Sequence, residues 1–526
     1  MKRILLMTMV LLGALTACEK EDFEESYANP SKISTSSVEK QFAGFISANR
    51  EYVVPSYWNY FVVLRPTVNR YTQAVGWVNA NSQYVPGAGL VSNRWDNYYN
   101  FLAQYREFEK IYNKQSQDDQ ELRRIFMIAA TIYLYDHTQK VVDLHGDIPF
   151  SEAGMLSVNG GDYEASLPKY DPAETIYSTM LDNLKAFADE LNGIEITSAI
   201  QKGFKTQDII NNGDLGRWQA YCNSLRLRML MRVSESPAFQ SRANSEIQTI
   251  IANPSDYPLV TDNADNIQIE VFDLNTAINA KGFRAGLEDW QGNLAGKAMI
   301  DQMVSTDDPR LRVIFEPGPN AAGVYTGLDP TLDGSDQQEL ADGGTIAIYN
   351  RSTFSRNEYF PGMLISAAEV NLLLAEYHLR TGNDALAKTA YNNAIEQSIL
   401  QYYAIRSVSN DNTAGAVDPV EDAEIALYQN DGAVAWDLAL NANAKLELIA
   451  TQKWLHFNVV QSLEGWAEQR RLGLPALDFW VDESNAQELP PNRWLYAPSE
   501  NTYNTINYDA VRAKDNLATR IFWDVD

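Results

Sequence analysis

Cysteine and histidine are scarce in this chain, whose 526 residues include two cysteines and four histidines. Cys18 follows an apolar N-terminal stretch and is expected to be acylated, so Cys222 has no partner for an intramolecular disulfide. A multi-thiolate metal site and a cysteine nucleophile are therefore excluded. No histidine stands in a metal-binding spacing such as HExxH. Cys222 shares a helical face with Trp218, Leu225 and Met229, which predicts a small core residue.

Positive charge and long apolar runs are also in short supply. The sequence has 42 basic against 69 acidic residues, a formal net charge of −27. A surface for nucleic acid or an anionic membrane needs a positive face to displace counterions, so both kinds of partner are excluded. The apolar run of residues 4–15 is too short to cross a bilayer, because a spanning helix needs about 20 apolar residues.

The N-terminus has the composition of an export signal. Two basic residues precede the apolar run, which ends in Leu15-Thr16-Ala17-Cys18. This tetrapeptide resembles the lipobox of bacterial lipoproteins, in which the cysteine is acylated and becomes residue one after cleavage. We therefore expect residues 1–17 to be removed, Cys18 to carry a lipid anchor, and the acidic, serine-rich residues 18–40 to form a flexible tether. The alternative is an ordinary secretory signal in which Cys18 is a free thiol.

Apolar residues recur at three- and four-residue spacing over most of the chain, which predicts a mostly α-helical protein. Strand patterns are short, as at residues 345–349. The longest helical pattern has Arg470 and Arg471 in its last turn and Gly473 just beyond, as a helix C-terminus favours. The predicted helices cover residues 42–54, 95–112, 122–135, 172–191, 218–233, 364–379 and 446–466.

One stretch indicates how these helices are arranged. Between residues 369 and 399 a helix breaks at Thr381-Gly382-Asn383 and then resumes. Ala375 is followed by Ala387, Tyr391 and Ala394 at offsets of 12, 16 and 19, the spacing of a tetratricopeptide unit. One unit cannot bury both of its faces, so we expect further helical hairpins, with residues 172–191 and 218–233 as the leading candidate pair.

Long stretches rich in glycine, asparagine and aromatic residues lie between the helices, chiefly at residues 70–93 and 262–360. Loops of this length in an ordered protein are usually functional. Aromatic rings pack on the C–H face of a sugar while amides and guanidinium groups bind its hydroxyls, so these loops predict a ligand site. For each ring taken singly, the alternative to ligand binding is that the ring packs within its own loop. The candidate ligand-binding residues are Trp77, Asn79, Asn81, Tyr84, Phe283, Arg284, Trp290 and Tyr325.

No catalytic motif stands out. The sequence has no GxSxG elbow, Gly-rich phosphate loop or EF-hand. Asp143, His145 and Asp147 would share one face of an extended chain and could there bind a metal ion or act as acid and base. A turn with capping carboxylates is the favoured interpretation. A glycosidase needs two carboxylates about 5 to 9 Å apart, and no pair is singled out. A weak calcium candidate, for which a plain acidic turn is the alternative, consists of Asp329, Asp333 and Asp336.

Four blocks of sequence stand in an order that is typical of one protein family. The early blocks are Trp95-Asp96-Asn97-Tyr98-Tyr99 and Gly146-Asp147-Ile148-Pro149-Phe150-Ser151-Glu152-Ala153, the latter similar to a GDIPYSEA-like turn. The later two are Asn223-Ser224-Leu225-Arg226-Leu227-Arg228 and a block of late helices, which comprises Ser366-Ala367-Ala368-Glu369-Val370 and Arg470-Arg471-Leu472-Gly473-Leu474-Pro475. Together with the lipobox and the repeat unit, they give the chain a resemblance to the SusD/RagB family, particularly its SusD-like branch.

The resemblance implies a tetratricopeptide-like helical scaffold with long variable loops, forming one domain over residues 41–526. It implies a lipoprotein without enzymatic activity or cofactor, exposed on the outer membrane of a Gram-negative bacterium and held there by its lipid alone. Its expected role is to capture oligosaccharides and deliver them to a SusC-like TonB-dependent transporter. A peptide-capturing, RagB-like lipoprotein is one alternative, and a surface glycosidase is the alternative from the enzyme class.

Overall fold

The computed structural model describes residues 36–484 and 487–525. The predicted signal peptide (1–17), Cys18 and most of the predicted tether (18–40) lie outside them. The end of that tether is helical: α3 (Val38–Ala48) begins with Val38, which is 1% exposed, and Ser37 Oγ accepts a hydrogen bond from the Lys40 amide. A serine cap and a buried valine thus start the first helix before the predicted boundary.

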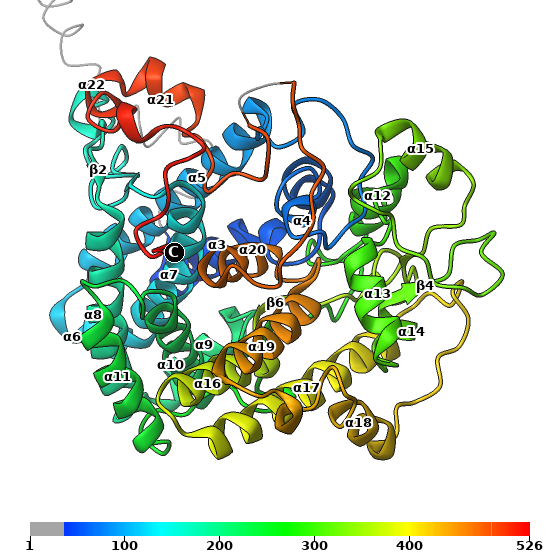
Figure 1. Ribbon diagram of the computed structural model, residues 1–526. Helices are drawn as coiled ribbons and strands as arrows, with labels where there is room; N and C mark the ends of the chain where they lie inside the picture. Colours follow the sequence, from blue (N-terminus) through cyan, green and yellow to red (C-terminus); the bar gives the residue numbers. More distant parts are fainter. Residues whose placement is uncertain (1–35, 485–486, 526) are drawn as a thin grey trace, which may run out of the picture.

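Helices dominate this part of the chain (Figure 1). Helices α8 and α11 run along one side of the molecule, and the short helices α12 to α15 gather on the opposite side. The longer helices are α5 (Ala88–Asn113), α7 (Arg124–His145), α8 (Ala173–Leu191), α10 (Leu215–Arg232), α11 (Gln240–Ala252), α16 (Ala367–Arg380), α17 (Asp384–Ser407), α19 (Ala442–Phe457) and α20 (Ser462–Leu472).

Three short antiparallel pairs make up the sheets within the described residues. They are β1 (Ile148–Pro149) with β2 (Tyr170–Asp171), β3 (Ile267–Ile269) with β6 (Gly362–Ile365), and β4 (Phe315–Glu316) with β5 (Ile348–Tyr349). The predicted strand at 345–349 is therefore confirmed only in its last two residues. The prediction of a mostly α-helical fold is confirmed.

The predicted repeat unit is present as the hairpin of α16 and α17. Gly382 lies in the turn with φ 78°, a conformation that L side chains rarely adopt. The four residues that define the repeat spacing are at most 1% exposed and pack in one cluster: Ala375, Ala387, Tyr391 and Ala394. Small residues let the two helices approach closely, and this sequence register is confirmed.

The second predicted helix pair also packs together. Helix α8 contacts α10, although α9 (Ser198–Gln207) is inserted between them in the sequence. Cys222 of α10 is fully buried, and its Sγ donates to the Leu184 carbonyl oxygen of α8 at 3.3 Å. Burial raises the pKa of the Cys222 thiol to about 12. The prediction that Cys222 is a core residue is confirmed.

Two further helices depart from their predicted bounds. The predicted helix at 446–466 is divided, because the chain turns sharply at Asn458, with φ 25°, between α19 and α20. Helix α7 continues past residue 135 and includes Asp143 and His145 in its last turn, so the predicted turn at these two residues is wrong. Only Asp147 acts as a capping carboxylate: its Oδ1 accepts from the Ala173 amide of α8 at 2.9 Å.

Buried ion pairs join the helices of the scaffold. Arg228 of α10 bonds to Asp136 of α7 and to Glu369 of α16, both at 2.9 Å. Arg471 of α20 reaches Glu376 of α16 at 2.7 Å, and both arginines are at most 2% exposed. The planar guanidinium group satisfies several carboxylate oxygens at once, which suits it to such buried junctions. These arginines, found in the family-like sequence blocks, are therefore scaffold residues.

The two predicted loop segments contain helices of their own. Residues 88–93 begin α5, and residues 262–360 include α12 (Phe283–Glu288), α13 (Lys297–Ser305), α14 (Leu311–Ile314) and α15 (Gly334–Asp342). Helix α12 packs on η2 (Trp58–Leu64), a segment far away in the sequence. This contact positions the candidate site. The division into one domain with two insertions stays a prediction.

Candidate functional site

Three of the eight predicted ligand residues line one small cavity. Trp77, Asn79 and Tyr84 surround a volume of about 20 Å³. Such a cavity has room for about one water molecule, so a sugar ring cannot enter it. A ligand could only lie across the mouth of the cavity, against side chains that remain exposed.

Asn79 and Tyr84 are used by the fold itself. Asn79 Nδ2 donates to the carbonyl oxygens of Pro330 and Leu332, at 2.8 Å each. Tyr84 is 3% exposed, and its hydroxyl donates to the Trp480 carbonyl oxygen at 2.8 Å. These two side chains tie the 70–93 segment to the rest of the molecule, whereas Trp77 keeps a partly exposed ring.

Trp77 lies in a stack of cations and rings. The Arg70 guanidinium lies 4.3 Å from its ring centroid, and the Arg65 guanidinium lies 5.9 Å from it. Arg65 in turn lies 4.3 Å from the ring of Phe61. Burial lowers the pKa of Arg65 to about 10 and that of Arg70 to about 9, so both are cations at neutral pH. Each such contact is worth about 0.5 to 2 kcal/mol, which holds the rings in place.

The stack continues onto η2, a π-helix that the sequence analysis missed. The rings of Tyr57 and Phe61 stack at 4.9 Å with an interplanar angle of 14°, and Trp58 meets Tyr57 edge-on at 5.7 Å. Trp58 is 55% exposed, whereas Tyr60 on the other face of the segment is buried. Short π-helical segments are frequent at functional sites. The available signal was the run of residues 57–61, with four aromatic rings in five residues.

Trp290 presents its indole to solvent and is 87% exposed. It has φ 57° and ψ 38°, in the left-handed region, and Gln291 follows with φ 56°. This conformation costs an L-residue about 1 to 2 kcal/mol. Two contacts hold the turn: Arg65 Nη1 donates to the Asp289 carbonyl oxygen at 2.5 Å, and Gln291 Nε2 donates to Asp342 Oδ1 at 3.1 Å.

Two glycines bring this turn next to η2. A methyl group on Gly286 would come within 3.1 Å of the Ser56 carbonyl oxygen, and one on Gly282 within 2.8 Å of the Tyr57 amide nitrogen. Only glycine therefore lets α12 lie this close to η2. The aromatic platform is the name we give to Tyr57, Trp58, Phe61 and Trp77, which are linked by ring contacts and by Arg65, together with Trp290, whose backbone turn bonds to Arg65 through the Asp289 carbonyl oxygen.

The other predicted ligand residues are distributed differently. Phe283 is fully buried and packs on Tyr60 with ring centroids 4.4 Å apart, so it is a core residue. Arg284 is exposed on α12, with its Nε 3.9 Å from a Glu288 carboxylate oxygen. Asn81 is exposed and Tyr325 is half-buried. Ligand binding by the exposed members of this set stays a prediction.

The predicted calcium residues do not converge. Asp329 Oδ1 accepts from the Thr331 amide at 2.9 Å and from its hydroxyl at 2.7 Å, as in an ordinary turn. Asp333 precedes α15, and Asp336 lies in the first turn of that helix. Within residues 36–484 and 487–525, no three histidine, cysteine or acidic side chains are grouped as metal ligands would be.

Sequence comparison identifies the family. A family model described as starch-binding and associating with the outer membrane matches residues 57–497. The chain belongs to this SusD-like family. The match starts at Tyr57 of the aromatic platform and spans the helical scaffold. A search of curated protein sequences finds no significant match. In the part of this SusD-like protein that the structure describes, no helix combines the length and apolarity needed to cross a bilayer.

Solved structures share the fold of this SusD-like protein. A chitin-binding protein is 22% identical with a TM-score of 0.72, and 92% of this chain covers 100% of that one. A SusD-like protein titled Bacteroidetes AC2a is 20% identical with a TM-score of 0.74, with coverages of 93% and 100%. A chitin-binding SusD homologue from Flavobacterium johnsoniae is 22% identical with a TM-score of 0.70, with coverages of 92% and 99%. At these identities the likeness shows a common fold.

Proposed function

We propose that this SusD-like protein is a cell-surface lipoprotein that captures oligosaccharides on its aromatic platform. The observation that carries the proposal is Trp290, whose ring is 87% exposed on a left-handed backbone. The strained turn costs stability and the exposed ring contributes almost none, so a binding role accounts for their presence. The neighbouring rings of the platform extend the surface on which a sugar can lie.

The chemistry of the platform suits a weakly held glycan. The C–H face of a sugar packs on an aromatic ring, and the exposed amide and guanidinium groups of Asn81, Arg284 and Gln291 can bond its hydroxyls. If each ring covers about 50 Å² of apolar surface, it contributes roughly 1.2 kcal/mol. Three rings then give about 4 kcal/mol, the free energy of a millimolar complex. Such affinity suits a protein that passes its ligand on.

Delivery to a SusC-like TonB-dependent transporter and anchoring through Cys18 complete the proposal. Membership of an outer-membrane-associated family supports both the delivery step and the anchor. The lipobox-like Leu15-Thr16-Ala17-Cys18 supports the anchor. Cys18→Ala should abolish labelling by a palmitate analogue and release the chain from the membrane fraction. If the variant still fractionates with outer membranes in cells that lack the transporter, the anchor is elsewhere.

Calorimetry with defined ligands tests the capture step. The ligands are oligosaccharides from starch and chitin, chosen from the descriptions of the family and of two structural relatives, and a set of mixed peptides. Trp58→Ala and Trp290→Ala should each weaken binding of the correct glycan about eightfold, the equivalent of 1.2 kcal/mol. Tyr503→Ala is the matched control, because this ring is 68% exposed on α21 (Pro498–Tyr503), far from α12 in Figure 1.

Three outcomes contradict the proposal. Unchanged affinity in both tryptophan variants removes the aromatic platform as the site. A preference for peptides over every glycan tested favours the peptide-capturing alternative. Sustained release of reducing ends from a bound glycan, lost on mutation of one carboxylate, shows a glycosidase.

A further inference from the structure

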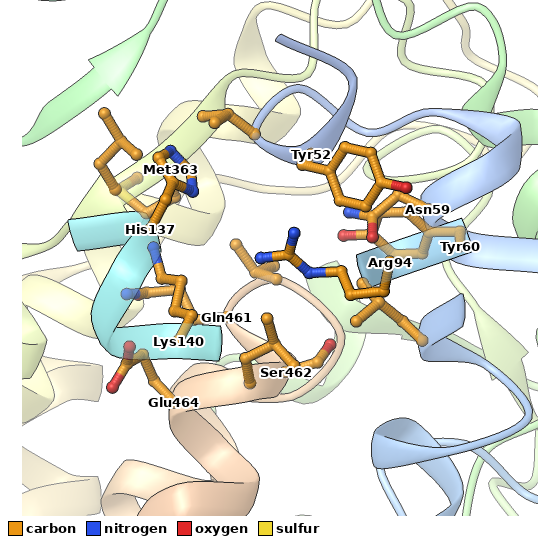
Figure 2. Close-up of a pocket in the computed structure, with 15 residues that line it drawn as sticks. Tyr52, Asn59, Tyr60, Arg94, His137, Lys140, Met363, Gln461, Ser462 and Glu464 are labelled. Carbon is orange, nitrogen blue, oxygen red and sulfur yellow. The ribbon is translucent and has the colours of Figure 1, made fainter. Parts of the chain in front are cut away.

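A second site lies beneath η2, on the side away from the aromatic platform. Here a partly open cavity of about 50 Å³ is lined by residues of η1 (Arg50–Tyr52), η2, α5, α7, β6 and α20. Its walls are partly apolar, with Leu64, Leu364 and Val460 among them. Figure 2 shows the guanidinium group of Arg94 directed into the middle of the cavity, opposite His137 and Lys140.

Arg94 has no protein partner that neutralises its charge. Its side chain is 2% exposed, its Nε has no hydrogen-bond acceptor, and no carboxylate of the described residues lies within ion-pair distance. It makes a cation–π contact with the ring of Tyr52, whose centroid lies 4.9 Å from the guanidinium carbon. A buried guanidinium without a counter-charge is strongly unfavourable, because burial removes the water that solvates it. Burial accordingly lowers the pKa of Arg94.

The other charged groups at the cavity are already paired. Lys140 Nζ lies 2.7 Å from Asp136 Oδ1, and Glu464 Oε2 lies 2.6 Å from Arg232 Nη2. His137 is buried, and its Nε2 has no hydrogen-bond partner. Burial, with the Lys140 and Arg94 charges beside it, holds the His137 pKa well below its ordinary value, so the ring is neutral at neutral pH and can donate one N–H. Arg94 is thus the unneutralised charge that faces this cavity.

We propose that this cavity is a binding site for one small monovalent anion of the chloride class, bound by Arg94 and contacted by His137. A cavity of about 50 Å³ has room for a small ion and a few water molecules. A sugar acid or a phosphate ester is too large. Because Asn59, Tyr60 and Leu64 of η2 line the same cavity, the anion ties η2 to α5 and α7. This proposal does not depend on glycan binding by the aromatic platform.

Bromide, which scatters anomalously, tests the site directly on the unmodified protein. Crystals grown in bromide should show an anomalous peak within hydrogen-bonding distance of the Arg94 guanidinium. Density only at exposed lysines and arginines would overturn the proposal. A crystal structure in which the Glu464 carboxylate has turned to pair with Arg94 would do so as well.

Thermal melting gives an independent measurement. Replacing gluconate, which is too large for the cavity, by chloride at constant ionic strength should raise the melting temperature saturably, by roughly 2 to 3 °C at a hundredfold excess over Kd. Arg94→Met should abolish this chloride dependence, whereas Arg512→Met, which removes an exposed arginine outside both proposed sites, should keep it. Equal melting in chloride and gluconate would refute the site. If Arg94→Met does not fold, the bromide crystals decide.

Discussion

Replacing Trp290 by glycine should separate ligand binding from stability. The indole is 87% exposed, so its removal takes almost no packing from the core. The backbone has φ 57° and ψ 38°, where glycine avoids a cost of about 1 to 2 kcal/mol. Glycine also loses about 0.5 to 1 kcal/mol more backbone entropy on folding. The free energy of unfolding should therefore rise by about 0.5 to 1 kcal/mol.

The affinity of Trp290→Gly for the glycan should fall. The lost ring contact of about 50 Å² corresponds to roughly 1.2 kcal/mol, or an eightfold weaker complex. Urea unfolding gives the stability change, and calorimetry with the best glycan of the screen gives the affinity. Trp290→Ala is the control for strain: it should lose the same affinity but remain less stable than the glycine variant. Normal binding by Trp290→Gly, or a loss of more than about 1 kcal/mol in stability, would refute the reasoning.

Three further predictions concern the scaffold. Ala387→Trp should overpack the hairpin of α16 and α17 and lower the free energy of unfolding, measured in urea melts, by about 1 to 3 kcal/mol. Lys388, whose side chain is 41% exposed, is the control: Lys388→Ala should change the free energy of unfolding by less than about 0.5 kcal/mol. Equal shifts in the two variants would reject the predicted register. Burial holds the pKa of His456 at about 3 and those of His137 and His145 well below the ordinary value of 6.5, so as pH falls below 6.5 the unfolded chain takes up protons that the folded chain does not. Stability should therefore drop by about 4 kcal/mol between pH 7.5 and 5.5, and by about a third less in His456→Gln; a flat profile would contradict this. The Cys222 thiol should resist alkylation by iodoacetamide in the folded protein and react once urea unfolds the chain. Fast labelling without urea would show that α8 and α10 are not packed as described.

The sequence alone was sufficient where structure depends on local spacing. The helical hairpin at 367–407 follows from four small or aromatic residues at fixed offsets and a glycine in the turn. Cys222 was correctly placed in the core because its helical face is apolar throughout. The helix boundaries failed at Asp143 and Asn458, because burial against distant segments overrides local propensity.

The candidate site was only partly predictable. Trp77 and Trp290 were chosen as rings in long loops, yet Tyr84 and Phe283 met the same description and are buried. Composition cannot separate an exposed ring from a packed one, since the difference lies in what covers it. Trp58 lies on η2 and is 55% exposed. It was missed because a run of aromatic residues suggests a buried segment when the elements that pack against it are unknown.

The sequence by itself determined the helical class and the repeat unit, because each depends on residue type and on spacing within one turn or hairpin. Only the tertiary structure decided which rings form a surface. Phe61, Trp77 and the Asp289 carbonyl beside Trp290 meet at the Arg65 guanidinium, although more than 200 residues separate the first from the last. That meeting requires Gly282 and Gly286, which let α12 lie against η2. The unpaired Arg94 beneath η2 likewise becomes evident only when several distant elements come together around it.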